Sequence, residues 1–234
     1  MTVDFTSITF KDVSRNFGRR RALANISFSV EAGELVALLG ANGSGKSTLL
    51  SIAATLLAPT SGEVLYGDAT AGHAGGALRK QIGLLGHDLY LYQELTAAEN
   101  LRFFSDLYGL DARERRVREA LECAALVDRA DDPVHAYSRG MRQRLALERA
   151  LLHEPRLLLL DEPFTGLDDA SAAALRSRLT ETRSRGAIIL VTTHELEAID
   201  TLVDAAYVLS RGRAERLADG GGSLRDRYRR QVQA

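Results

Sequence analysis

The chain has 234 residues with 30 basic and 31 acidic side chains, so its net charge is close to zero, which excludes a global field that would draw it to nucleic acid or to an anionic bilayer. Hydrophobic residues make up 45% and charged residues 26%, which excludes a disordered or fibrous chain and predicts one α/β domain with a small appended lobe. No signal peptide opens the sequence and no apolar run approaches the roughly 18 residues needed to span a bilayer, so we expect a cytoplasmic protein.

Short apolar runs alternate with long amphipathic stretches, as expected of the strands and helices of an α/β fold. Residues 8–10 and 26–30 show polar alternation, which predicts an antiparallel, half-exposed β subdomain. Residues 35–39, 157–160 and 188–191 are apolar at every position, as expected of strands buried on both faces. The sequence therefore predicts a mostly parallel core sheet flanked by helices.

A phosphate-binding loop of the P-loop type follows the first buried strand and leads into an apolar helix. Its residues are Gly40, Ala41, Asn42, Gly43, Ser44, Gly45, Lys46, Ser47 and Thr48. The glycines allow backbone angles and close approaches that a Cβ would block, so successive N–H groups can surround the phosphates of ATP. We expect Lys46 to neutralise the β- and γ-phosphates and Ser47 to place its hydroxyl on Mg²⁺, with the helix directing its positive end at the anion. A glycine-rich turn without a ligand is the alternative.

Strand signals disappear between Thr96 and Leu152, where helical periodicity takes over. We expect a helical subdomain at 88–155, inserted into an ATP-binding core made of 1–87 and 156–219.

Two smaller features complete this organisation. Cys123 lies in a helical stretch, where a buried thiol is expected. Because it is the single cysteine of the sequence, a disulfide within the chain is excluded. The last segment, 220–234, begins with three glycines that predict a flexible link, followed by a short helix capped by Ser223.

Two carboxylates, Asp161 and Glu162, end the all-apolar strand 157–160. The carboxyl end of a buried parallel strand opens on the ligand crevice, at the edge where the glycine loop must also lie. We expect Asp161 to hold Mg²⁺ through water and Glu162 to orient and deprotonate the attacking water, which predicts an ATPase. Helix-capping acids are the alternative.

The order of these motifs resembles the nucleotide-binding domains of ABC transporters, over almost the whole chain. Residues 137–144, Tyr-Ser-Arg-Gly-Met-Arg-Gln-Arg, are similar to the family's signature at the start of a helix. Arg139 replaces the usual first glycine and Met141 the usual glutamine, while Ser138 and Gly140 are retained. The resemblance implies that Ser138, Arg139 and Gly140 contact ATP held by a partner subunit, so that a homodimer encloses two ATP molecules. A capping role alone is the alternative for Ser138.

Three further residues each match a functional position of the family. Phe17 is similar to the aromatic residue that stacks on adenine, with core packing as the alternative. Asp168 matches the residue that helps to align the two subunits, although turn chemistry alone also explains it. His194 matches the switch histidine that senses the γ-phosphate, and joins Glu162 and Lys46 as the catalytic set; a structural histidine is the alternative.

His87 occupies the place of the family's usual glutamine. His87 lies eight residues before Leu95, which is the spacing that most members of the family show without a gap. Gln93 is therefore not the residue that matches the family's glutamine. A neutral imidazole offers one nitrogen lone pair and prefers softer metals than Mg²⁺, which disfavours direct ligation; action through water and a hinge role are the alternatives. Residues 89–92 are expected either to dock helices of a membrane partner or to serve helix packing.

The Gly86–His87 pair, residues 95–101 and the Ser-Arg-Gly-Met variant resemble the CcmA subgroup, haem exporters of cytochrome c maturation. The same variant occurs in drug, lipid and polysaccharide exporters, so the cargo stays open. The resemblance implies ABC transporter membrane subunits as partners and a peripheral location at the inner face of the cell membrane, with no nucleic acid.

Other classes of protein fit less well. Ribosome-acting members of the family carry two such domains and DNA-repair members insert a long coiled coil, and this chain has neither. A small-molecule kinase would share the glycine loop without needing the carboxylate pair, the signature and His194 in this order. The arginines at 225, 227, 229 and 230 are expected to form a solvated helix face, with contact to phosphate or lipid head groups as the alternative.

Overall fold

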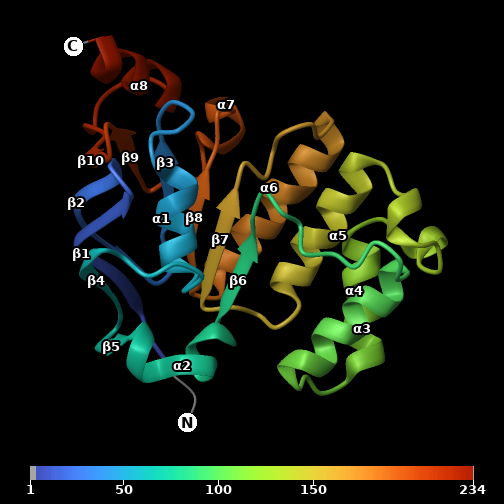
Figure 1. The fold of residues 1–234 in the computed structure, drawn as a ribbon. Helices are drawn as coiled ribbons and strands as arrows, with labels where there is room; N and C mark the ends of the chain where they lie inside the picture. The colour runs from blue at the N-terminus through green and yellow to red at the C-terminus, as the bar shows by residue number, and fades with distance from the viewer. Residues whose placement is uncertain (1–3, 234) are drawn as a thin grey trace.

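A six-stranded, mostly parallel sheet forms the centre of the molecule (Figure 1). The computed structural model describes residues 4–233. The strand order is β10-β9-β3-β8-β7-β6, and only β10 pairs antiparallel to its neighbour. The strands are β3 (Leu35–Leu39), β6 (Ile82–Leu85), β7 (Leu157–Asp161), β8 (Ile188–Thr192), β9 (Ala205–Ser210) and β10 (Arg213–Arg216). The three all-apolar runs are the neighbouring strands β3, β8 and β7, which confirms the predicted parallel core.

A second, antiparallel sheet has the order β2-β1-β4-β5. Its strands are β1 (Ser7–Phe17), β2 (Arg20–Glu31), β4 (Ser61–Tyr66) and β5 (Ala69–Thr70). The predicted antiparallel element is confirmed, but β1 and β2 are much longer than the alternating stretches 8–10 and 26–30. The register of β1 on β2 shifts between Phe10 and Val13, and Asp12 has a φ of 49°. This bulge interrupts the period-two pattern, so the alternation in sequence ends before the strand does.

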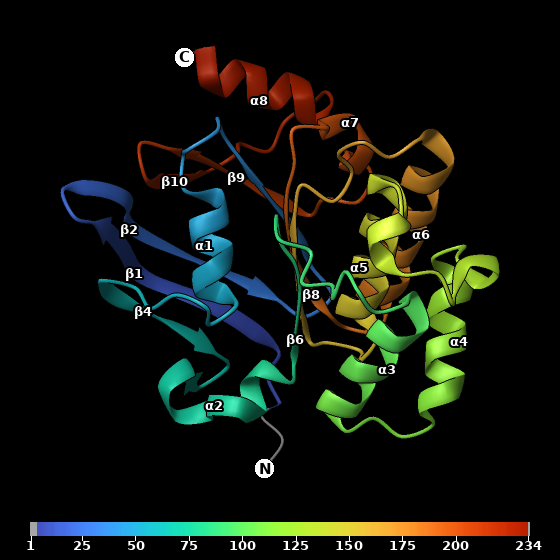
Figure 2. The same ribbon diagram turned by 45° about the vertical axis from the view of Figure 1, so that its right-hand side comes forward.

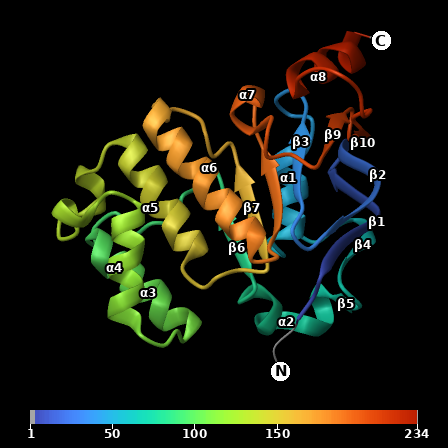
Figure 3. The ribbon, with the colours of Figure 1, turned by 180° about the vertical axis from the view of Figure 1, so that it is seen from behind.

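Helices cover both faces of the central sheet. They are α1 (Lys46–Ala53), α5 (Arg139–Leu151), α6 (Asp169–Ser184), α7 (Leu196–Ile199) and α8 (Leu224–Gln233), while α2 (Ala71–Arg79) packs on β4 and β5 of the antiparallel sheet. One apolar core joins α1 and the antiparallel sheet to one face of the parallel sheet, and a second joins α5, α6, α7 and α8 to the other face. Figure 2 shows α1 between the two sheets, and Figure 3 shows α6 covering the rear face. Ser223 caps α8, because its Oγ lies 3.2 Å from the Asp226 N–H.

Residues 97–151 form a cluster of three helices at one side of the sheet (Figure 2). They are α3 (Ala97–Tyr108), α4 (Arg113–Cys123) and α5 (Arg139–Leu151), with short 3₁₀ turns at Val127–Arg129 and Val134–Ala136. They share a third apolar core, to which α5 contributes Leu145 while its Ala146 and Ala150 pack in the core of the sheet. Thus α5 is the helix common to both parts.

The expectation of a buried thiol at Cys123 is wrong, because its side chain is exposed. The buried face of α4 is made by Val117, Ala120 and Leu121, and Cys123 follows Leu121 by two positions, which turns it away from that face. Within residues 4–233, no helix is both long and apolar enough to cross a membrane.

Candidate functional site

The sequence motifs meet at one edge of the parallel sheet, where β3, β6, β7 and β8 have their carboxyl ends. A cavity of about 440 Å³ opens there, within the usual size range of small-ligand sites. Predicted residues supply most of its lining: Phe17, Asn42, Gly43, Gly45, Lys46, Ser47, Thr48, His87, Asp161 and Glu162. Arg20 and Ala22 also line it and were not predicted. Both come from the start of β2, whose approach to the loop is a tertiary contact with no local sequence signal.

The glycine loop between β3 and α1 has the backbone that its sequence predicts. Gly40 has a φ of 140° and Gly45 a φ of 110°, in the region where side chains are strained. A Cβ at Gly40 would lie 2.3 Å from the Leu209 carbonyl oxygen, and one at Gly45 would lie 2.7 Å from that of Ala22. The loop is therefore wedged between β2 and β9, which fixes the path of its N–H groups around the cavity.

Lys46 begins α1, and its ammonium is fixed beneath the loop. It is only 6% exposed, and Nζ donates to the carbonyl oxygens of Gly40 at 2.7 Å and Ala41 at 3.2 Å. Burial lowers the pKa of Lys46, while the charges of Glu162 and Asp161 oppose that shift. The Lys46 ammonium is thus held by carbonyl dipoles and nearby carboxylates, and it can turn from them to an anion that enters the cavity.

Asp161 and Glu162 are positioned by Thr192 at the end of the neighbouring strand β8. The Thr192 hydroxyl donates to Asp161 Oδ1 at 2.5 Å and accepts from the Glu162 N–H at 3.0 Å. Glu162 has a φ of 53°, so the chain turns sharply where the strand ends. Thr192 was not predicted, although a buried polar residue directly after the apolar run 188–191 is a signal that could have identified it.

His194 joins the glycine loop to the acidic strand. Its N–H donates to Glu162 Oε2 at 3.0 Å, and its Nε2 lies 3.2 Å from Glu162 Oε1 and 2.9 Å from Asn42 Oδ1. Three segments far apart in sequence therefore meet at one carboxylate. The Glu162 side chain is 28% exposed, so it faces the cavity while its two oxygens are oriented by His194.

Phe17 lies at the mouth of the cavity with 47% of its surface exposed. The alternative of core packing for Phe17 is therefore wrong. Arg15 stacks its guanidinium 4.8 Å from the centre of the Phe17 ring, and donates to the Ala58 carbonyl at 3.0 Å. Arg15 was not predicted, and it supports an aromatic ring that is available to a flat ligand.

The signature and Asp168 do not line the cavity within the described part of the chain. Ser138 caps α5, since its Oγ accepts from the Met141 N–H at 3.2 Å, and Arg139 and Gly140 form the first turn. Asp168 caps α6 through the Ser171 N–H at 2.8 Å, and this bond lowers the pKa of Asp168. Ser138 thus has the capping role that was its alternative, and Asp168 has a capping role where turn chemistry was the alternative considered. Both lie at helix N-termini that can accept a further anion.

The signature helix also contacts the turn after β7. Gln143 Nε2 donates to the carbonyl oxygens of Pro163 at 3.0 Å and Glu162 at 3.4 Å. This link was not predicted, because 20 residues separate Gln143 from Pro163 in the sequence.

The donor set at the cavity fits a magnesium ion bound together with a phosphate. Residues 4–233 contain no group of three or more His, Cys, Asp or Glu that could form a metal cage. Mg²⁺ usually keeps water and takes one or two protein oxygens besides substrate phosphates, so Ser47 and Asp161, which both line the cavity, are sufficient. His87 lines the same cavity, but its imidazole favours softer metals.

A glycine loop with a buried lysine, next to a carboxylate pair at the carboxyl edge of a parallel sheet, defines a P-loop nucleoside triphosphatase. The family can be stated more closely, because the model of the family described as "ABC transporter" matches residues 23–165. The chain belongs to this family. It is an ATP-binding subunit of the ABC transporter class and an ATPase.

Two curated relatives illustrate the family. The linearmycin resistance ATP-binding protein LnrL of Bacillus subtilis is 33% identical over 86% of this chain and 66% of the relative. A Nod factor export ATP-binding protein I of Burkholderia orbicola is 38% identical over 91% of this chain and 70% of the relative. The chain thus spans about two thirds of the length of these relatives.

A solved structure supports the fold and the reaction. It is a dimeric ATP-binding cassette in a post-hydrolysis state with ADP and phosphate bound, 27% identical to this chain, with a TM-score of 0.79 over 91% of this chain and all of that chain (100%). The mixed α/β fold with a parallel core and an antiparallel sheet is therefore confirmed as that of an ABC cassette.

Proposed function

We propose that this chain powers an exporter of small organic molecules from the inner face of the cell membrane. Two copies would enclose two ATP molecules and drive membrane subunits of the ABC transporter type. The geometry of Glu162 carries the hydrolytic part of this proposal, because a carboxylate oriented by His194 faces a cavity lined by the phosphate-binding loop.

Each residue of the cavity has a role that its position supports. The N–H groups from Gly40 to Gly45 surround the phosphates, and Lys46 exchanges its carbonyl partners for phosphate oxygens. Ser47 and Asp161 would hold Mg²⁺, which would supply positive charge to neutralise the phosphates. Glu162 orients and deprotonates the attacking water, and His194 keeps the carboxylate in place.

The two helix N-termini that lie outside the cavity support the proposed homodimer. Ser138 and Gly140 at the start of α5 and Asp168 at the start of α6 have no nucleotide of their own chain to contact. A second copy would supply that nucleotide, and the solved cassette named above is itself dimeric. The composite site that results would require both chains for hydrolysis.

A groove beside the sheet is suited to a membrane partner. It has a volume of about 450 Å³, and Tyr90 and Tyr92 on its wall are 50% and 49% exposed. Leu89 and Leu91 of the same segment instead pack towards the apolar cores. Both alternatives for residues 89–92 therefore have support, since leucines pack inward while tyrosines remain available to a docked helix.

The cargo is inferred from the relatives. The two described above are named for linearmycin resistance and for Nod factor export, and neither is named for haem. Export of small organic molecules is therefore the leading proposal. Haem export in cytochrome c maturation remains a prediction from the Gly86–His87 pair, residues 95–101 and the signature variant.

One genetic experiment separates the two cargoes. A deletion strain is complemented with wild-type protein or with Glu162→Gln, and c-type cytochromes are measured by haem stain alongside growth in a panel of antibiotics. We expect normal cytochromes in the deletion and increased antibiotic sensitivity that only wild-type protein reverses. Loss of covalent haem, restored by wild-type protein alone, would replace the proposed cargo with haem.

A further inference from the structure

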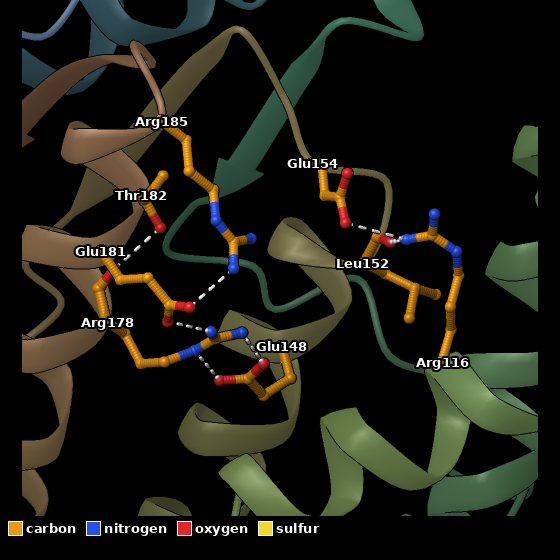
Figure 4. Close-up of polar contacts among 8 residues, drawn as sticks. All are labelled: Arg116, Glu148, Leu152, Glu154, Arg178, Glu181, Thr182 and Arg185. Atoms are coloured by element: carbon orange, nitrogen blue, oxygen red, sulfur yellow. Dashed lines mark hydrogen bonds and ion pairs between the residues drawn. The ribbon is translucent and has the colours of Figure 1, made fainter.

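A buried ion pair joins the signature helix to α6, outside the ATP cavity (Figure 4). Glu148 of α5 is 2% exposed. Both of its carboxylate oxygens accept hydrogen bonds from Arg178 of α6. Arg178 Nε donates to Glu148 Oε1 at 3.1 Å, and Arg178 Nη2 donates to Glu148 Oε2 at 2.7 Å. Arg178 Nη1 also donates to Glu181 at 2.8 Å, and Arg185 donates to the other oxygen of Glu181 at 2.6 Å. We call Glu148, Arg178, Glu181 and Arg185 the α5–α6 clasp.

The clasp is expected to add little net free energy of folding where it joins the two helices. Burial raises the pKa of Glu148, while the charge and hydrogen bonds of Arg178 oppose this shift. Apolar side chains of similar volume often give equal or greater stability than such a pair, because neither charge must leave water. What the pair adds is direction, since a planar guanidinium that binds both oxygens of a carboxylate fixes their relative orientation.

The clasp is placed symmetrically relative to the two helix N-termini of the composite site. Glu148 lies ten residues after Ser138, the N-cap of α5, and Arg178 lies ten residues after Asp168, the N-cap of α6. Each N-cap is therefore about 15 Å along its helix from the clasp. A second link, from Arg144 Nη1 to Ser171 Oγ at 3.3 Å, joins the same helices nearer the N-termini.

Apolar packing alone leaves the rotation of α5 poorly determined. This helix packs Ala146 and Ala150 against the core of the sheet and Leu145 against the core of the helical cluster. Contacts of this kind are non-directional, so the directional contacts of α5 carry more of its rotational register. Gln143 bonds to the Glu162 and Pro163 carbonyls, and Arg149 bonds to the Leu84 carbonyl. The clasp and the Arg144–Ser171 link are the contacts that join α5 to α6. A rotation would displace Ser138 and Gly140 relative to Asp168.

We propose that Glu148 and Arg178 are positioning residues for ATP hydrolysis. They set the rotational register of α5 against α6, so that Ser138, Gly140 and Asp168 together fit the ATP of the partner chain. This inference rests on the composite site proposed above and adds residues that touch neither nucleotide nor metal.

The test replaces the ion pair with an apolar one. Glu148→Met/Arg178→Met removes both charges and leaves similar volume, so we expect the thermal unfolding midpoint to stay close to that of the wild type. We expect kcat for ATP to fall by about tenfold or more with KM and nucleotide affinity unchanged, because a misplacement of about 1 Å caused by a mutation far from the chemistry can cost up to about 100-fold. Arg115→Gln/Glu119→Gln removes an exposed ion pair of α4 and serves as the control, with unchanged kcat expected.

Wild-type kcat in a stably folded Glu148→Met/Arg178→Met variant would overturn the proposal. If that variant does not fold, Arg178→Lys decides instead, because it keeps the charge but cannot bind both carboxylate oxygens. Reduced kcat with unchanged nucleotide affinity in Arg178→Lys supports the positioning role, and wild-type kcat contradicts it.

A second arm separates this inference from the composite site itself. Glu162→Gln is expected to dimerise in ATP, as measured by light scattering after size-exclusion chromatography. If Glu162→Gln dimerises and Glu162→Gln/Arg178→Lys needs about tenfold more protein to do so at saturating ATP, the clasp acts on the composite site. If Glu162→Gln stays monomeric at saturating ATP, the proposed dimer fails, and the role of the clasp at the partner's ATP fails with it. If Glu162→Gln dimerises and Arg178→Lys keeps wild-type kcat, only the clasp fails.

Discussion

The cavity at the glycine loop and the N-termini of α5 and α6 differ in how completely one chain assembles them. At the cavity, direct hydrogen bonds join the glycine loop, the ends of the strands and His194. The part of the site that surrounds the nucleotide is therefore assembled within a single chain. At the helix N-termini, Ser138 and Asp168 bond only to their own first turns. The difference supports the proposal that one chain binds ATP whereas two chains are needed to hydrolyse it.

The largest expected effect is on hydrolysis without binding. Glu162→Gln keeps the shape of the side chain but removes the base, so kcat should fall about 1000-fold while ATP affinity is retained. Steady-state phosphate release and equilibrium binding of a fluorescent ATP analogue measure the two quantities. Normal turnover in this variant would remove Glu162 from its role.

Lys46→Ala should act on binding instead. The ammonium is the cation fixed beneath the loop, and its loss should weaken ATP binding about 100-fold, the value expected for hydrogen bonds to a charged group. Isothermal titration with ATP and Mg²⁺ checks this. Unchanged affinity would contradict the assignment of the phosphate-binding loop.

Thr192→Val sharpens the comparison within the cavity. It removes the hydroxyl that bonds both Asp161 and the Glu162 N–H, without a change in size, so kcat should fall about tenfold while ATP affinity changes little. The matched control is Thr180→Val, whose hydroxyl bonds only the Arg176 carbonyl within α6. Equal kcat values for the two variants would show that Thr192 does not position the carboxylates.

A further effect concerns stability at low pH rather than the ATPase reaction. Burial lowers the pKa of His153 to about 4, and its ring stacks on Tyr108 at 3.9 Å. Because the folded protein favours the neutral ring, this contribution is fully present above the unfolded pKa of about 6.5 and is lost as the pH falls from there towards 4, about 3 kcal/mol in all. Chemical unfolding across this range should show a weaker pH dependence for His153→Phe than for the wild type.

The sequence predicts well what is encoded in adjacent residues. The glycine loop and the Asp161–Glu162 pair were found because a few neighbouring residues carry both the chemistry and the strand or helix that presents it. The buried parallel strands were found for the same reason. The family resemblance placed His194, and the structure brings it against Glu162.

What the sequence could not show are contacts between distant segments. Thr192 and Gln143 each act through partners more than 15 residues away in the chain, and so does Glu148 through Arg178. Arg15 stacks on the nearby Phe17 but is anchored by the distant Ala58 carbonyl. The full lengths of β1 and β2 were not predicted, because a bulge ends the alternation of polar and apolar residues before the strands end. The exposure of Cys123 was not predicted either, because a shift of one or two positions along a helix decides which way a side chain points.

The central claim is that hydrolysis needs two chains, and complementation tests it most directly. Gly140→Asp places a carboxylate at the start of α5, and a Cβ there meets nothing within 4 Å, so the fold should be kept while the partner's phosphate is repelled. Lys46→Ala and Gly140→Asp should each be inactive alone. Mixed, they can form one complete site, with the loop of one chain and the α5 N-terminus of the other, and ATPase activity should reappear. A mixture as inactive as its parts, although both proteins are folded and mixed dimers form, would contradict the composite site.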